Sequence, residues 1–137
     1  MTIAEIEDEI VAEFDLFDDQ MEKYEYIIDI GKKLPPLDAS YMTDDFLVKG
    51  CQSKVWLHAS EKDGLLYFEA DSNSTITKGI IALLIRVLSG KSATEITNAQ
   101  LEFIDRINLR SHLSSQRSNG LTSMIQKMKA YAAAYKA

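Results

Sequence analysis

The residue best suited to chemistry is Cys51, the single cysteine among 137 residues. It lies in the sequence Gly-Cys-Gln-Ser at 50–53, between two short runs rich in β-branched and aromatic residues. This pattern predicts a strand, a tight turn that carries the thiol, and a second strand. A free cysteine commonly acts as a buried small hydrophobe. Here the polar neighbours leave the sulfur accessible, and Lys49 and Lys54 favour the thiolate, so we expect a reactive cysteine.

Other functions for this thiol remain open from the residue types alone. His58 or His112 could serve as a base for Cys51 in a hydrolase or a thiol transferase, although neither histidine has an evident orienting Asn or Asp. One thiol and two imidazoles do not supply the four ligands of a structural zinc site. An iron–sulfur scaffold usually needs several thiolates. A purely structural interaction module is the remaining alternative.

The composition indicates a single acidic domain over residues 1–137. A chain of this length buries about 68% of its unfolded surface, which is enough for one core. The net charge of −6 argues against binding to nucleic acid or to an anionic membrane. The acidic start, with Glu5, Glu7 and Glu9, is unlike a secretory signal, and the apolar run at 79–85 is too short to span a membrane. We therefore expect a cytoplasmic protein with a protein or small-molecule partner.

Three strands are predicted to position the thiol, at 46–50, 53–60 and 65–71. They would form a small antiparallel sheet, with the second and third strands joined by a turn at 61–64. If that turn closes in register, Lys54 lies opposite Asp71, and the polar loop at 71–75 lies beside Cys51. The alternative is that Lys54 and Asp71 form only an exposed cross-strand pair. Along the second strand, Val55, Leu57 and Ala59 alternate with Lys54, Trp56 and His58, and the second set would face outward or under a loop. Trp56 could equally belong to the core.

Helices are predicted around this sheet from caps and from apolar periodicity. The first two helices are expected at 3–14 and from 18 or 19 to 31, with Met21 buried. The third is expected at 76–89, with Asn73 or Ser74 as its cap. A short helix would start at 92, another would run from 97 or 98 to 105, and the last would start at 114 or 115. The first N–H groups of the 76–89 helix would favour negative charge on the sulfur. Gly120 predicts close approach of another backbone, and Arg117 in the last helix suggests an anionic target. The segment 34–45 either crosses the sheet or shapes a site.

Three blocks of this sequence together resemble the SufE family of sulfur acceptors. They are Val-Lys-Gly-Cys-Gln-Ser-Lys-Val-Trp at 48–56, Asp-Ser-Asn-Ser at 71–74 with Lys-Gly at 78–79, and His-Leu at 112–113 with Arg-Ser-Asn-Gly-Leu at 117–121. The segment from Tyr24 to Pro35 is also similar to the second helix of that family and its exit. The resemblance therefore covers nearly the whole chain.

The resemblance implies an α/β fold of the α+β type, in which a small antiparallel sheet packs against helices as in iron–sulfur scaffold proteins. It also implies that Cys51 accepts sulfur as a persulfide from a cysteine desulfurase of the SufS or CsdA type and delivers it to an iron–sulfur scaffold complex. Pyridoxal phosphate would then be on the desulfurase, and this chain would need no cofactor or metal. We expect a monomer or homodimer. The residues expected to support Cys51 or to contact the partner are Gly50, Gln52, Ser53, Trp56, Asp71 and Arg117.

Overall fold

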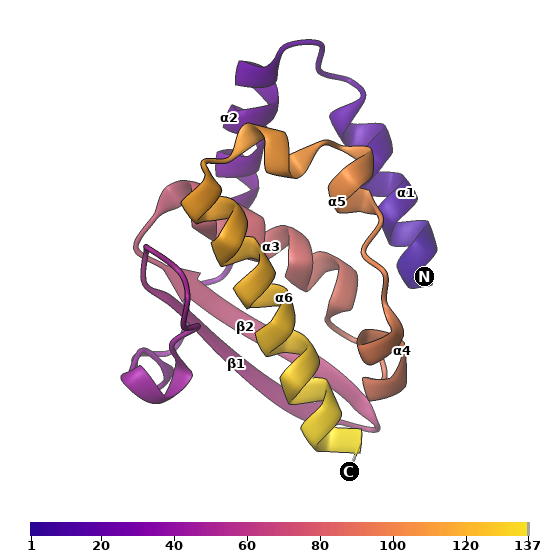
Figure 1. The fold of residues 1–137 in the computed structure, drawn as a ribbon. Helices are drawn as coiled ribbons and strands as arrows, with labels where there is room; N and C mark the ends of the chain where they lie inside the picture. The colour runs from indigo at the N-terminus through magenta and orange to yellow at the C-terminus, as the bar shows by residue number, and fades with distance from the viewer. Residues whose placement is uncertain (137) are drawn as a thin grey trace.

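Over residues 1–136, a β-hairpin and six α-helices form the fold (Figure 1). The computed structural model describes residues 1–136, with the side chains of all of these except His112 and Lys136. In chain order the elements are α1 (Ile3–Phe14), α2 (Gln20–Lys32), the 3-10 turns η1 (Ala39–Tyr41) and η2 (Asp44–Phe46), β1 (Val55–Lys62), β2 (Leu65–Ser72), α3 (Thr75–Leu88), α4 (Ala93–Asn98), α5 (Phe103–Arg106), the 3-10 turn η3 (Leu109–His112) and α6 (Ser115–Lys136). This mixture of helices and an antiparallel sheet confirms the predicted fold class.

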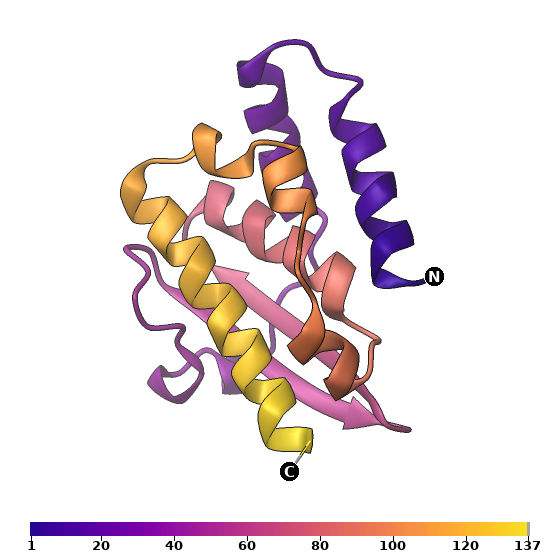
Figure 2. The same cartoon turned by 45° about the vertical axis from the view of Figure 1, so that its right-hand side comes forward.

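The hairpin separates a core face from an outer face. Val55, Leu57 and Ala59 of β1 point into the core, where α3 and α6 cover them (Figure 2). The residues between them, including His58, point to the other face, and Tyr41 of η1 stacks on the His58 ring at 3.8 Å. This alternation was predicted from the period of two in the strand. The segment 34–45 therefore does cover the hairpin, on its outer face.

The predicted third strand at 46–50 was wrong. Within the described residues the sheet has two strands, and Leu47 makes one isolated bridge to Trp56. The η2 turn takes up the start of this segment, because the Leu47 N–H donates to the Asp44 carbonyl oxygen at 3.3 Å. Gly50 then turns the chain away with a φ of +92°. Only the Val48 N–H remains to pair with β1, through the Val55 carbonyl oxygen at 2.8 Å.

The predicted register of the hairpin was also wrong, by two residues. Lys62 pairs with Leu65, so the turn consists of Asp63 and Gly64 alone. Their φ angles of +56° and +81° fit the two-residue type I′ turn that Asp-Gly favours. A shift of two leaves every side chain on its predicted face. It places Asp71 opposite Trp56, however, and moves Lys54 beyond the end of the ladder.

The predicted helix starts are mostly confirmed, because their caps are local. Both capping boxes form, Thr2 with Glu5 and Ser92 with Glu95, and Ser74 caps α3. Two other predictions were wrong. The helix expected from 97 or 98 starts only at 103, since α4 continues to Asn98. Met21, expected in the core, is 62% exposed.

The centre of the core is α3, most of whose apolar side chains are fully buried. It lies against α2 at two glycines. A Cβ placed on Gly31 would be 2.6 Å from the Gly79 nitrogen, and one placed on Gly79 would be 2.0 Å from the Ile27 carbonyl oxygen. Gly31 therefore lies inside α2, which ends one residue after the predicted stop. Among residues 1–136, no helix has the length and apolar character needed to cross a membrane.

Candidate functional site

Cys51 lies on a loop that is anchored at both ends. Before it, the Val48 N–H is bonded to the Val55 carbonyl oxygen, and the Val48 side chain is in the core. After it, the Lys54 N–H donates to the Asn73 side-chain oxygen at 3.0 Å, and the Asn73 N–H donates back to the Lys54 carbonyl oxygen at 3.2 Å. The loop at 71–75 therefore does lie beside the thiol loop, as expected, although through Asn73.

The thiol lines a narrow pocket between its own loop and the first turns of two helices. The lining residues are Cys51, Gln52, Ser53, Thr77, Gln116, Arg117, Gly120 and Met124. Thr77 is in the first turn of α3, and Gln116 and Arg117 are in the first turn of α6. The pocket has a volume of about 10 Å³, close to the space that one water molecule needs. It can shelter a sulfur atom but does not have the volume of a substrate site.

Gly120 of α6 is in direct contact with the sulfur. The Cys51 thiol donates a hydrogen bond to the Gly120 carbonyl oxygen, with a sulfur to oxygen distance of 3.6 Å. A Cβ placed on Gly120 would be 3.3 Å from the sulfur and 3.8 Å from the Cys51 Cα. The predicted close approach of another backbone at this glycine is confirmed, and that backbone is the thiol loop itself.

The structure brings together only part of the predicted site. Gln52, Ser53 and Arg117 share the pocket with Cys51. The Gly50 backbone is packed against the Ser123 side chain of α6, next to the pocket. Arg117 donates a hydrogen bond to the Tyr24 hydroxyl oxygen at 3.2 Å, which links α6 to α2.

Two of the predicted supporting residues lie elsewhere. Asp71 is paired with Lys78 of α3 at 3.3 Å, and its side chain is 15% exposed. Trp56 is half-buried on the hairpin face that points away from the core. Neither residue lines the pocket of Cys51.

His58 is not positioned as a base for Cys51. It is on the outer face of the hairpin, where Tyr41 stacks on its ring and its Nδ1 is 3.5 Å from the Glu69 carboxylate. It does not line the pocket of the thiol. The prediction for His112 concerns a side chain outside the described part of the structure.

Burial raises the pKa of the Cys51 thiol above its ordinary value. The expectation that Lys49 and Lys54 favour the thiolate is therefore wrong for this arrangement of the loop. Removing the sulfur from water disfavours its charged form. The Gly120 carbonyl oxygen accepts a hydrogen bond that only the protonated thiol can donate. In this arrangement the site stores a protonated thiol.

The free energy of unfolding should fall at alkaline pH because of this thiol. An unfolded cysteine ionises near pH 8.5, about its ordinary pKa. The folded pKa is higher, so the contribution of Cys51 is fully present below that pH and is lost as the pH rises through the folded pKa. Urea unfolding at several pH values should show this loss in the parent and not in Cys51→Ala. The tyrosines, present in both proteins, cancel in this comparison, and equal pH slopes would contradict the assignment.

The sequence prediction missed three pocket residues, Thr77, Gln116 and Met124. Gln116 and Met124 are spaced by four residues on either side of Gly120, so all three lie on one face of α6. That spacing could have identified them once Gly120 was expected to touch the thiol loop. Thr77 had no comparable signal, because only the packing of α3 brings its first turn to the loop.

Known proteins share much of this sequence. Residues 8–132 match the family model described as "SufE: Fe-S metabolism associated domain". An uncharacterized SufE-like protein of Rhizobium meliloti (strain 1021) is 42% identical over 130 residues, which cover 91% of this chain and 93% of that protein. The "SufE-like protein 1, chloroplastic/mitochondrial" of Arabidopsis thaliana is 39% identical over 121 residues, 88% of this chain and 33% of that protein.

A solved structure shares the fold at lower sequence identity. It is the solution structure of a hypothetical protein from Thermus thermophilus, with a TM-score of 0.76 and 17% identity, and the match covers 93% of both chains. The family match extends over both anchors of the thiol loop and over the helices that form its pocket. The chain therefore belongs to the SufE family, whose domain is associated with iron–sulfur metabolism.

Proposed function

We propose that this protein accepts sulfur on Cys51 from a cysteine desulfurase, stimulates that enzyme, and carries the sulfur to an iron–sulfur scaffold. The observation that supports this most is the placement of the thiol, which lies on a loop in a pocket with room for little more than a sulfur atom. A carrier needs a thiol that another protein can reach and that can afterwards be sheltered. Membership of the SufE family supports the same role.

The proposed step is a transfer of sulfane sulfur. The Cys51 thiolate attacks the terminal sulfur of a cysteine persulfide on the desulfurase, and a new sulfur–sulfur bond forms on Cys51. The sulfur–sulfur bond on the desulfurase breaks, and its cysteine leaves as a thiolate. The proton of the Cys51 thiol passes to solvent or to that leaving thiolate. The exchange has no net oxidation or reduction, so it needs no further reactant.

The thiol must leave its resting position to take part in this step. Burial and the contact with Gly120 keep it protonated, whereas attack requires a thiolate. We expect the loop from 49 to 53 to open when the desulfurase docks, because Val48 and Lys54 are anchored and the residues between them are mostly exposed. Opening would make the sulfur accessible to the partner, and its exposure to water would lower its pKa.

The pocket is suited to the loaded form as well. Residues from the first turns of α3 and α6 line the pocket with the sulfur, and one of them, Arg117, carries a full positive charge. A persulfide that returns to the pocket would meet groups that favour negative charge. This shelter would limit its loss to reductants until a scaffold is reached. A lone thiol of this kind suits a reducing compartment such as the cytoplasm.

The chemistry that breaks the carbon–sulfur bond of cysteine belongs, in this proposal, to the pyridoxal phosphate of the desulfurase. This chain would contribute its thiol, its shelter and a docking surface around the loop. Gln52 and the Arg117 side chain are at the open edge of that surface. The alternative function, a hydrolase, has less support, because the His58 ring stacks on Tyr41 on the outer face of the hairpin, away from the thiol.

Mass spectrometry after incubation with a cysteine desulfurase and cysteine tests the proposal. We expect the peptide that contains residue 51 to gain about 32 Da, the mass of one sulfur atom. Cys51→Ser should gain nothing. The matched variant His58→Ala should load like the parent, because this histidine is outside the pocket. Unloaded parent protein beside an active desulfurase would contradict the sulfur-accepting role.

A further inference from the structure

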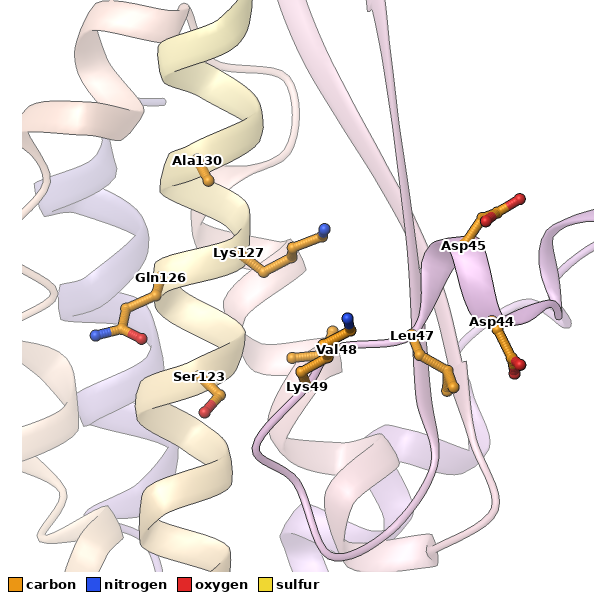
Figure 3. A pocket seen from close by; sticks show the side chains of 9 residues that line it. All are labelled: Asp44, Asp45, Leu47, Val48, Lys49, Ser123, Gln126, Lys127 and Ala130. Atoms are coloured by element: carbon orange, nitrogen blue, oxygen red, sulfur yellow. The ribbon is translucent and has the colours of Figure 1, made fainter.

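A second pocket lies on the other side of the thiol loop. It has a volume of about 500 Å³, within the range of small-molecule sites. One wall is the segment 44–49 that leads into the loop, and the other is the exposed side of α6 (Figure 3). The lining residues are Asp44, Asp45, Leu47, Val48, Lys49, Ser123, Gln126, Lys127 and Ala130. Gly50, the next residue in the chain, touches Ser123 at its edge.

Two ammonium groups face the inside of this pocket. Figure 3 shows Lys127 extending from α6 toward the 44–49 segment, with the Lys49 ammonium in the same space. The carboxylates of Asp44 and Asp45 are directed away from the helix. Among the described side chains, no carboxylate lies within 4.0 Å of either lysine, and Lys127 has only the Tyr131 ring at 5.1 Å. Two cations that face one space without a carboxylate partner favour an anion there.

The two lysines belong to parts of the protein that separate when the loop opens. Lys49 is the first residue of the loop that we expect to open, whereas Lys127 is on α6. An anion that binds both lysines holds the start of the loop against the helix. It therefore binds the closed loop more tightly than the open one. By linkage, such a ligand shifts the protein toward the closed state, and opening of the loop in turn weakens the binding of the ligand.

We propose that this pocket binds a small multivalent anion of the phosphate or polycarboxylate class, and that the bound anion keeps the thiol loop closed. The anion bridges Lys49 and Lys127 and lowers the accessibility of Cys51. As a regulator of sulfur uptake, the site rests on the proposed function. The coupling of anion to thiol is a property of this chain alone and can be measured without a desulfurase.

The experiment measures the rate at which iodoacetamide alkylates Cys51 in the intact protein. Iodoacetamide is uncharged, so its encounter with the thiol is not screened by salt. Inorganic phosphate and citrate are titrated separately at constant pH, with sodium chloride at equal ionic strength as the reference. We expect each anion to slow alkylation about fivefold at saturation, the low end of ordinary allosteric coupling. The difference between phosphate and citrate shows which anion class the pocket prefers.

Matched lysine variants identify the site. Lys127→Gln should lose the anion effect and keep the parent rate in chloride, whereas Lys127→Arg, which keeps the charge, should retain the effect. Lys62→Gln removes the same charge at the far end of β1 and should behave like the parent. In parallel, backbone amide NMR signals at Lys49, Gly50 and Ser123 should shift with the same saturation curve.

Three results would overturn the proposal. They are an alkylation rate that neither anion changes, a Lys127→Gln protein slowed as much as the parent, and saturable NMR shifts without any change in rate. None of these results bears on sulfur loading measured by mass spectrometry. Conversely, failure to load sulfur would leave the coupling of anion to thiol intact.

Discussion

The variant Gly79→Ala should lose about 3 kcal/mol or more of its free energy of unfolding. The added Cβ would be 2.0 Å from the Ile27 carbonyl oxygen and 2.7 Å from the Ile27 carbonyl carbon. These are backbone atoms of α2, so they cannot rotate away, and α2 and α3 must separate. Alanine favours an isolated helix over glycine by about 1 kcal/mol, which is too little to offset this overlap. Equilibrium urea unfolding followed by circular dichroism measures the loss.

Gly64→Ala is the matched control for this effect. Gly64 is in the hairpin turn with a φ of +81°, and a Cβ placed there has no neighbour within 4 Å. The substitution therefore adds only backbone strain, about 1–2 kcal/mol. If Gly79→Ala proved no less stable than Gly64→Ala, the close packing of α2 on α3 would be refuted.

The second large effect is expected at the hinge of the thiol loop. In Gly50→Ala, Cys51 should react with iodoacetamide about five- to thirtyfold faster, because the closed loop becomes less stable by about 1–2 kcal/mol. Residue 50 has a φ of +92° in the closed loop, and an added Cβ would be 2.5 Å from the Ser123 hydroxyl oxygen. The strain of the positive φ and the overlap with Ser123 are both relieved if the loop opens and this residue adopts a negative φ. The rate of alkylation at fixed pH measures the open population.

A double variant separates the two causes. In Ser123→Ala the hydroxyl is absent and its Cβ is 3.4 Å from the added atom, so Gly50→Ala in that background should keep only the φ effect. Gly64→Ala carries a comparable φ strain away from the thiol and should leave the alkylation rate unchanged. A parent-like rate in Gly50→Ala would mean that the loop does not open at this glycine.

These two glycines position different parts of the candidate site. Gly79 lets α3 lie deep against α2, which fixes the first turn of α3 and hence Thr77 beside the sulfur. Gly50 lets the loop turn back onto α6 so that Cys51 reaches Gly120. If the sulfur-carrier proposal is right, Gly50→Ala should load sulfur readily and lose it readily to reductants, because the shelter would be populated less.

Local signals in the sequence predicted much of the fold correctly. The capping boxes at Thr2 and Ser92 form as expected, since their partners are three residues away. The period of two in β1 identified its core face. The local signals failed where another element competes for the same groups. Leu47 was expected in a strand, but the η2 turn uses its N–H.

Only part of the candidate site was predicted correctly from the sequence. Cys51 and its neighbours Gln52 and Ser53 were identified from the sequence, and the structure places them together. Asp71 was expected beside the thiol from a register that proved two residues wrong, and it pairs with Lys78. Thr77 was missed because no pattern near Cys51 in the sequence indicates a contact between the two residues.

The sequence by itself determined which atom can react, because one thiol on a polar turn leaves no other candidate of its kind. Only the tertiary structure decided the protonation state of that thiol. Burial raises its pKa, and it donates a hydrogen bond to a carbonyl oxygen 69 residues away in the chain. Desolvation is a sum over all atoms that exclude water, and those atoms come from α3, α6 and the loop together. The sequence shows which lysines are near Cys51 in the chain, but it does not show how far the folded protein excludes water from the thiol.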